Sequence, residues 1–242
     1  MATILANLQA VCDEANEPQV SAYDDNRQLL ALLESVSREL RQLACFPQQK
    51  RSYSFNTSAS DAEYALPADY YMGIQGTYYD QTRAWSLIGP LSDSEWNYRQ
   101  YGPGSASNTF AYRVFGPDIG QYSSSQQFEL DPTPAATIAL SFDYITSRMF
   151  YESGFTPTTT TKETVGADTD VSMFDDDILI AGTLYRYLEI RKKDYADAFR
   201  RYQKLIERAK TRHHGSFKGS FARGRRGVRR YYPTEGWGGW SL

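Results

Sequence analysis

The spacing of apolar residues changes twice along this chain. In residues 3–15 and 25–45 the apolar side chains recur at steps of three and four, which predicts amphipathic helices. Across residues 51–151 they alternate with polar residues at a period of two, which predicts β-strands. The helical spacing returns over residues 175–212. We therefore expect an α+β fold: a helical bundle built from N- and C-terminal helices, with an inserted antiparallel β portion and an extended basic C-terminal tail.

The first two predicted helices are bounded by prolines and acidic residues. Pro18 closes the first helix, and Pro47 prevents the second from continuing. Asp24 or Asp25 is expected to cap the start of the second helix with its carboxylate. Because only a short loop joins the two helices, they should pack as a hairpin. We assign residues 1–48 to this helix pair.

The β portion is assigned to residues 49–164. It is rich in tyrosine, of which the whole chain has 19. Gly and Pro punctuate its short apolar runs, a pattern that predicts an antiparallel sheet of about five or six strands. One short helix is expected at residues 92–101, where Ser92 and Glu95 can form a capping box and Trp96 can anchor the helix. A threonine-rich polar loop follows at residues 155–170.

A long C-terminal helix, assigned to residues 165–212, is expected to complete the bundle. Its predicted inner stripe consists of Ala181, Leu184, Leu188, Tyr195, Phe199, Tyr202 and Ile206. The opposite side carries cations, namely Arg191, Lys192, Lys193, Arg200, Arg201 and Lys204. Three consecutive Asp at residues 175–177 and the basic residues near 208–212 stand at the ends that suit the helix dipole.

Charge is divided unevenly along the chain, although its formal net value is only −3. Residues 208–242 contain nine Lys or Arg and a single acid, Glu235, for a net charge of +8. Residues 1–207 contain 17 basic and 28 acidic residues, for a net charge of −11. An acidic body with a basic end points to a binding partner.

The sequence predicts no catalytic or metal site, no cofactor and no enzyme activity. Its only histidines, His213 and His214, lie in the tail, and its two cysteines, Cys12 and Cys45, are expected to be buried thiols. Two sets of polar residues offer functional alternatives, and we interpret both as structural. The first could form a catalytic carboxylate pair and consists of Asp168, Asp170 and Asp175–Asp177. The second could contact nucleic acid and consists of Arg83, Arg99 and Arg113. Residues 1–16 lack a secretory signal pattern, and no run approaches the roughly 18 apolar residues of a membrane span. We therefore expect no membrane partner and synthesis in a reducing cytoplasm.

The strongest local signal lies in the C-terminal tail (residues 213–242). Seven of its thirty residues are Gly and its apolar residues are isolated aromatics, so no independent fold is expected. Aromatic residues alternate with arginines, and both types anchor binding interfaces. The predicted docking residues are Phe217, Phe221, Arg223, Arg225, Arg226, Arg229, Arg230, Tyr231, Tyr232, Trp237 and Trp240. The residues alone leave two partners open, a protein surface or a nucleic acid.

Several segments, taken in order, resemble the bacteriophage head-to-tail adaptors, the connector proteins that bind beneath the portal. The opening helices, through "NRQLLALLESVSRELRQLACFPQQKRSYSF", are similar to the start of that family. Leu66, Pro67, Ala68 and Asp69 match its Leu-Pro-Ala-Asp stretch, which enters a strand. "FELDPTPAATIALSFDYITSRMF" resembles the strand–Pro–strand passage, and residues 166–209 resemble the closing helical segment.

This resemblance implies a virion structural protein. Its expected partners are the portal ring, a downstream tail or nozzle protein, and further copies of itself in a ring, commonly twelvefold. The ring would extend the DNA channel, with transient contact to viral DNA, and the tail would dock on the portal. Two other functions were weighed on the residues: a nucleic-acid-binding protein that uses the tail as an arm, and a carbohydrate-binding or carbohydrate-cleaving virion protein suggested by the Tyr-rich sheet.

Overall fold

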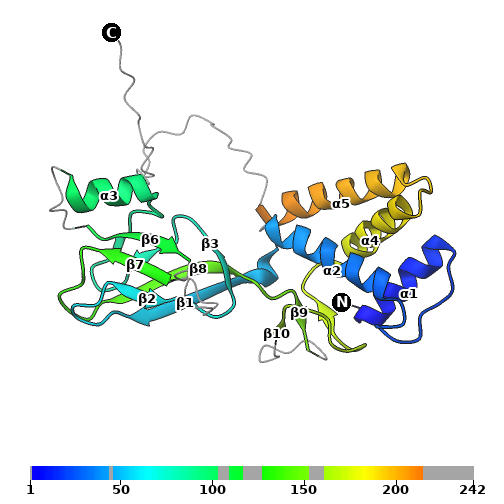
Figure 1. Cartoon of the computed structure of the whole chain (residues 1–242), viewed down its shortest axis with the longest axis horizontal. Coiled ribbons are helices and arrows are strands. Elements are labelled where there is room, and N and C mark those ends of the chain that lie inside the picture. Colours follow the sequence, from blue (N-terminus) through cyan, green and yellow to red (C-terminus); the bar gives the residue numbers. More distant parts are fainter. Residues whose placement is uncertain (1, 44–45, 103–108, 117–126, 153–160, 215–242) are drawn as a thin grey trace, which may run out of the picture.

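The chain folds into a helical lobe and a β lobe that lie side by side (Figure 1). The structure is a computed structural model that describes residues 2–43, 46–102, 109–116, 127–152 and 161–214. The chain passes from helices to strands after α2 and returns after β8. The predicted mixed α+β class is confirmed. The described residues form five α-helices, one more than the sequence predicted, together with antiparallel sheets.

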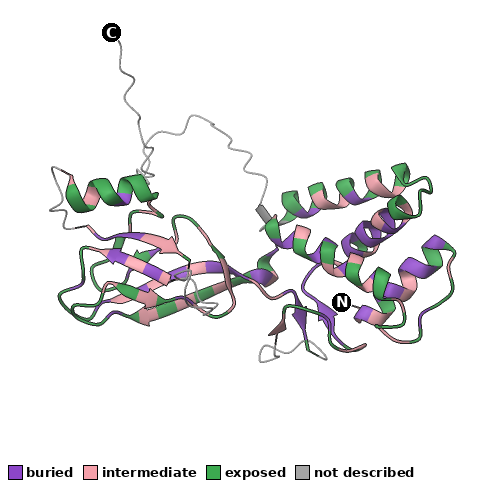
Figure 2. Ribbon diagram, in the orientation of Figure 1, coloured by how far each residue is buried: buried purple, intermediate pink, exposed green. Residues whose placement is uncertain are grey.

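Four helices share the larger buried cluster. They are α1 (Ile4–Ala15), α2 (Arg27–Gln42), α4 (Asp176–Ile190) and α5 (Ala196–His214). Most residues of α4 are buried, and in Figure 2 it is mainly purple, whereas the outer side of α5 is green. Gly182 permits this packing, because a Cβ there would lie 2.7 Å from Cγ1 of Val36 and 2.8 Å from the Tyr202 ring. The glycine thus lets α2 and α5 approach α4 closely.

The expected cap of α2 was wrong by one or two residues. The side chain of Asn26, rather than that of Asp24 or Asp25, accepts a hydrogen bond from the Leu29 amide at 3.2 Å. The Asp25 carboxylate instead accepts hydrogen bonds from the amides of Ser21 and Ala22. Asp25 therefore stabilises the loop that precedes the helix.

The single long helix predicted over 165–212 was also wrong, because the structure has two helices there. At the end of α4 the chain turns at Lys192, which has a φ of 55°, and the Lys193 amide donates to the Leu188 carbonyl at 3.0 Å. A continuous helix would have to place Arg191 or Lys192 in its apolar stripe. Turning instead keeps these cations exposed and lets α5 pack back on α4.

Two antiparallel sheets form the β lobe. The first comprises β1 (Lys50–Asn56), β8 (Ala139–Thr146), β4 (Tyr79–Asp80) and β5 (Trp85–Ser86), with β3 (Tyr70–Gly73) also paired to β8. The second is β2 (Glu63–Ala65), β7 (Gln127–Asp131) and β6 (Ala111–Phe115). The period-two residues face each other between the sheets: the Tyr78 ring stacks on Tyr112 at 4.1 Å and on Phe142 at 4.8 Å between centroids. An aromatic core of this kind accounts for the Tyr-rich composition.

The short helix α3 (Asp93–Tyr101) begins as predicted. The Ser92 amide donates to the Glu95 carboxylate at 2.8 Å, the Glu95 amide donates to Ser92 Oγ at 3.4 Å, and Trp96 is buried. This capping box fixes the start of the helix.

The β portion ends earlier than residue 164. β9 (Phe150–Tyr151) and β10 (Thr161–Lys162) pair in a separate sheet with β11 (Val171–Ser172). Phe150 lies in the buried cluster of the helical lobe, so this small sheet packs with the helices. None of the described helices is long and apolar enough to cross a membrane.

Candidate assembly surfaces

Helix α5 forms a basic surface that leads into the tail. We call it the α5 basic face; its residues are Arg200, Arg201, Lys204, Arg208, Lys210 and Arg212, all exposed. Residues 1–190 contain 11 basic and 25 acidic residues, whereas residues 191–212 contain nine basic and three acidic ones. The change of sign therefore falls at the α4–α5 turn, earlier in the chain than residue 208, and both this turn and α5 carry the positive charge.

Some of these cations are paired and others are not. Arg200 pairs with Asp197 at 3.3 Å, Arg201 with Glu14 at 2.7 Å and Arg212 with Asp175 at 3.3 Å. Within the described chain, no acid lies within ion-pair distance of Lys204, Arg208 or Lys210. A shallow hollow lies over this end of the helix, lined by Lys204, Glu207, Arg208, Thr211 and Arg212. Lys204 and Lys210 are available to an acidic partner, whereas Arg208 also lines a hollow that contains Asp175, Asp176 and Asp177.

All eleven predicted docking residues of the tail, from Phe217 to Trp240, lie outside the described residues. What the structure describes is the helix that leads to them, which ends at His214 close to the junction between the two lobes (Figure 1). The assignment of these side chains to partner binding therefore remains a prediction from sequence.

Four of the acidic residues considered as paired carboxylates, Asp168, Asp170, Asp175 and Asp176, bind internal partners. The buried Asp170 carboxylate accepts hydrogen bonds from the amides of Gly166 and Ala167, at 2.8 and 3.0 Å. Asp168 accepts from the Tyr23 amide at 2.6 Å, and Asp176 accepts from the Ala2 amide at 2.8 Å. They therefore connect the α4 entry and its preceding loop to the N-terminal helices. In the described chain, no group of three or more His, Cys, Asp or Glu could hold a metal ion.

The three arginines weighed as nucleic-acid contacts also face internal partners. Arg99 pairs with Asp131, and Arg113 pairs with Glu129 at 2.5 Å while stacking over the Trp96 ring at 4.7 Å. Arg83 lies over the Phe110 ring at 4.9 Å. Arg99 and Arg113 therefore attach α3 to the second sheet.

Each of the two cysteines was expected to be a buried thiol. Cys12 is buried, and burial raises the pKa of its thiol. Cys45 lies outside the described residues.

The Leu-Pro-Ala-Asp stretch fastens β3 to the end of β8. The Asp69 carboxylate accepts hydrogen bonds from the Tyr144 hydroxyl at 2.9 Å and from Thr146 Oγ1 at 2.8 Å. Its backbone carbonyl accepts from the Ser147 amide at 2.6 Å. Asp69 thus fixes the point at which the chain leaves the β lobe.

Arg41, at the end of α2, contacts the same junction from the helical side. Its Nη1 donates to the Ser147 carbonyl at 2.7 Å, and its guanidinium lies 4.2 Å from the centroid of the Tyr71 ring. Sequence reasoning did not single out Arg41. An arginine at the end of an amphipathic helix, just before the change of period, is the only signal that could have identified it.

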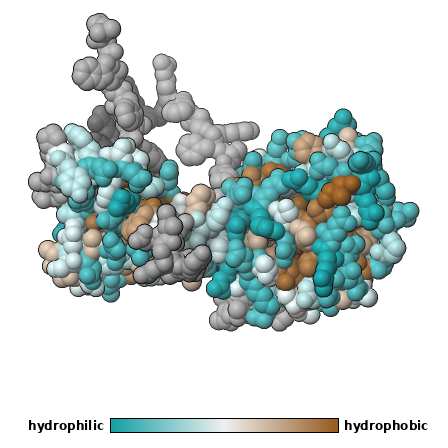
Figure 3. All heavy atoms as spheres, viewed as in Figure 1, coloured by the Kyte–Doolittle hydropathy of each residue, from teal (hydrophilic) through white to brown (hydrophobic). Residues whose placement is uncertain are grey.

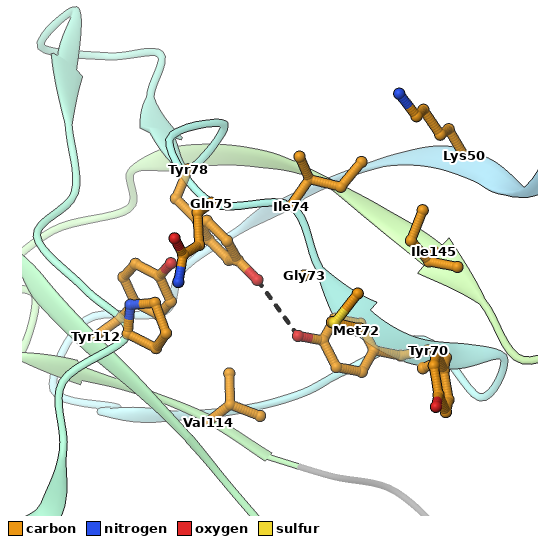
Figure 4. A pocket seen from close by; sticks show the side chains of 12 residues that line it. Lys50, Tyr70, Met72, Gly73, Ile74, Gln75, Tyr78, Tyr112, Val114 and Ile145 are labelled. Carbon is orange, nitrogen blue, oxygen red and sulfur yellow. Dashed lines mark hydrogen bonds between the residues drawn. The ribbon is translucent and has the colours of Figure 1, made fainter. Parts of the chain in front are cut away.

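A cavity of about 760 Å³ opens between β3 and β6 in the β lobe. We call it the tyrosine cavity; it is lined by Lys50, Tyr70, Tyr71, Met72, Gly73, Ile74, Gln75, Tyr78, Pro90, Tyr112, Val114 and Ile145. In Figure 4 the Tyr70 and Tyr78 hydroxyls point toward each other, and their oxygens are 3.3 Å apart. A Cβ at Gly73 would overlap the Tyr78 hydroxyl, so this pair of hydroxyls requires a glycine there.

Burial raises the pKa of both Tyr78 and Tyr112. These phenols therefore stay neutral and present an apolar surface with a few polar atoms. The sequence predicted aromatic strands but not this opening between them.

Comparison with known proteins identifies the family. Residues 2–231 match the sequence model of a family described as SU10 adaptor protein. The matched range includes both lobes and continues into the tail. A search of curated proteins finds no match to the chain. The resemblance to phage adaptors is thus supported over nearly the whole chain, and the chain belongs to the SU10 adaptor protein family of phage adaptors.

Proposed function

We propose that this protein is the head-to-tail adaptor of a virion: a ring beneath the portal that extends the DNA channel and joins tail components. The observation that carries the proposal is the family match over residues 2–231. The carboxylates considered as a catalytic pair and the arginines considered as nucleic-acid contacts also serve the fold. Asp168 and Asp170 accept backbone hydrogen bonds, and Arg99 and Arg113 pair with internal acids.

The tail and the α5 basic face form the proposed portal-docking surface. Residues 213–242 add six Lys or Arg and one acid to the positive charge of α5, and they supply the aromatic anchors. Arginine pairs with carboxylates in a planar bidentate geometry, and aromatic side chains fill pockets between subunits. Lys204, Arg208 and Lys210, which have no ion-pair partner among the described residues, suit the acidic rim of a protein partner.

The helical lobe is the proposed contact between neighbouring copies in the ring. Figure 3 shows brown, hydrophobic residues on this lobe between α2 and α5. Half-buried apolar residues flank the helical core, namely Leu5, Leu30, Leu32, Ile180, Leu188, Leu205 and Ile206. Ile190 and Tyr195, at the α4–α5 turn, are 51% and 41% exposed. Packing of a neighbour over these residues would remove apolar surface from water.

The β lobe is proposed to bind the next tail component. The acidic surface of the protein is proposed to line the DNA channel. Trp85, Tyr98 and Tyr101 are exposed on the β lobe at 50%, 67% and 87%, as binding anchors often are. A wall dominated by the acids of residues 1–190 would repel phosphates and let DNA slide. A ring whose lumen is lined mainly by Lys and Arg would contradict this part.

Assembly is proposed to require the portal. Ordering a tail of thirty residues costs roughly 1–2 kcal/mol per residue, so contacts with the portal must offset a large entropy loss. The purified protein should then be a monomer and form a ring, of about twelve copies by family resemblance, only with the portal present. Electron microscopy and light scattering of the protein with and without candidate portal rings test this. A stable ring of the isolated protein would contradict it.

A nucleic-acid-binding arm is the second candidate, favoured by the unpaired cations that extend the basic charge onto α5. Binding through phosphates falls steeply between low and moderate salt because counterions are released. DNA or RNA binding with this salt dependence, in the absence of any portal affinity, would favour the second candidate.

A further inference from the structure

The tyrosine cavity has a volume and an apolar lining that suit an aromatic side chain. Its lining is mainly apolar, and Met72 at its edge is 42% exposed although β3 is otherwise half-buried. The Tyr112 side chain is 1% exposed, and its hydroxyl is buried without a hydrogen-bond partner in the described structure. An indole combines a large apolar ring with a single N–H donor, so it matches an apolar cavity that contains a few phenol oxygens.

Lys50 places one positive charge at the rim of this cavity. It is exposed at the start of β1, the strand that the chain enters from the helical lobe. In Figure 4 its amine stands apart from the tyrosines, beyond Ile74 and Ile145. A partner segment that presents an aromatic ring and a carboxylate on one side would satisfy both the cavity and its rim.

Residues 233–242 of the tail have this pattern. The segment contains Glu235, Trp237 and Trp240 and no Lys or Arg, whereas residues 223–230 contain five Arg. In an extended segment, residues two apart lie on the same side, so Glu235 and Trp237 project together at a spacing of about 7 Å. We propose that in the free protein Trp237 of the same chain occupies the tyrosine cavity, with Glu235 paired to Lys50.

The chain can reach the site. Helix α5 ends at His214 near the lobe junction (Figure 1), and the Lys50 end of the cavity lies where β1 leaves that junction. The 23 residues from His214 to Trp237 can span up to about 80 Å when extended. The inference goes beyond the proposed function, because it concerns the free protein and involves no portal.

The test is fluorine NMR of the full-length protein labelled with fluorotryptophan. The four signals are assigned with the variants Trp237→Phe and Trp240→Phe, and the synthetic peptide of residues 233–242 gives the undocked positions. We expect the Trp237 signal to differ from the peptide and to move to the peptide position in Met72→Glu. Ile88→Glu, which alters an equally exposed apolar residue outside the cavity lining, is the matched control and should leave the signal in place.

A charge exchange tests the proposed pair directly. Lys50→Glu and Glu235→Lys should each increase the undocked fraction of Trp237 severalfold, and the double variant should restore docking. A Trp237 signal at the peptide position in the unaltered protein would overturn the proposal, as would insensitivity to Met72→Glu. A docked signal that grows with protein concentration would overturn the assignment to the same chain and give the site to the tail of a second copy. None of these outcomes decides whether the tail binds a portal.

Discussion

The guanidinium of Arg41 lies 4.2 Å from the centroid of the Tyr71 ring and joins the helical lobe to the β lobe. The Arg41 side chain is 11% exposed, and its Nη1 also donates to the Ser147 carbonyl at 2.7 Å. One residue of α2 thus contacts β3 and the segment that follows β8. Because the chain crosses between the lobes next to these contacts, Arg41 helps to set their relative orientation.

Replacing Arg41 by Ala should destabilise the protein by about 2–4 kcal/mol, because a buried charge-assisted hydrogen bond and a cation–π contact are both lost. Urea unfolding of Arg41→Ala measures this. The matched control is Arg38→Ala, since Arg38 lies exposed on the same helix and donates a hydrogen bond to the Glu34 carbonyl of its own helix. Equal free energies of unfolding for the two variants would show that Arg41 contributes nothing to the junction.

Asp69→Asn should lower stability by about 1–3 kcal/mol, because the amide retains one acceptor oxygen where the carboxylate supplies two. The Tyr144 hydroxyl and Thr146 Oγ1 both donate to that carboxylate, at 2.9 and 2.8 Å. Thermal unfolding checks the loss. Asp61→Asn is the control, because Asp61 is exposed and its side chain has no assigned hydrogen bond among the described residues. The idea fails if the Asp69 and Asp61 variants melt together.

Local patterns in the sequence were sufficient for elements that depend on neighbouring residues. The capping box of Ser92 and Glu95, the burial of Trp96 and the alternation that predicts β8 were all confirmed. In each case the determining contacts lie within a few residues along the chain, or follow from which face of a strand is buried.

Elements set by distant contacts could not be predicted in the same way. Strands β9, β10 and β11 are two residues each, too short for periodicity to identify, and exist through pairing between distant segments. The break between α4 and α5 depends on the tertiary packing of α5 against α4. Likewise, the tyrosine cavity is lined by residues of both sheets, an arrangement that no single strand reveals.

Gly182→Ala should destabilise the helical lobe by about 1–3 kcal/mol, although Ala favours helices, because the added methyl overlaps its neighbours. The new Cβ would lie 2.7 Å from Val36 Cγ1 and 2.8 Å from the Tyr202 ring. Gly116→Ala is the control, since a Cβ at Gly116 meets no atom within 4 Å. Chemical denaturation compares the two, and a gain in stability for Gly182→Ala would contradict the close packing.

The buried phenols predict loss of stability at alkaline pH. Burial raises the pKa of Tyr78, Tyr112 and Tyr202 in the folded state. These groups begin to ionise near pH 10 when the chain is unfolded. Above that pH the unfolded state binds fewer protons than the folded state, so stability falls as pH rises. Unfolding measured between pH 8 and about 11.5, with phenolate absorbance as a second signal, checks this sign.

Tyr112→Phe should reduce that alkaline loss and leave stability at pH 7 nearly unchanged, because the Tyr112 hydroxyl has no hydrogen-bond partner in the described residues. Tyr98→Phe is the control, since the Tyr98 side chain is 67% exposed. An alkaline slope in Tyr112→Phe equal to that of the unaltered protein would contradict a contribution from this phenol.

Removal of residues 213–242 should leave the fold intact and abolish portal attachment. The helical cluster is built from residues that precede them, and among the residues whose burial is described Ala209 is the last buried one of α5. Circular dichroism and the urea midpoint measure the fold, and co-sedimentation with portal rings measures attachment.

A second variant tests the α5 basic face separately from the tail. In the full-length protein, Lys204, Arg208 and Lys210 are changed to Glu. If both surfaces dock on the portal, this variant should attach more weakly at low salt although its tail is unaltered. Unfolding of the truncated chain would refute the separation of tail and fold, and undiminished attachment would refute the docking role.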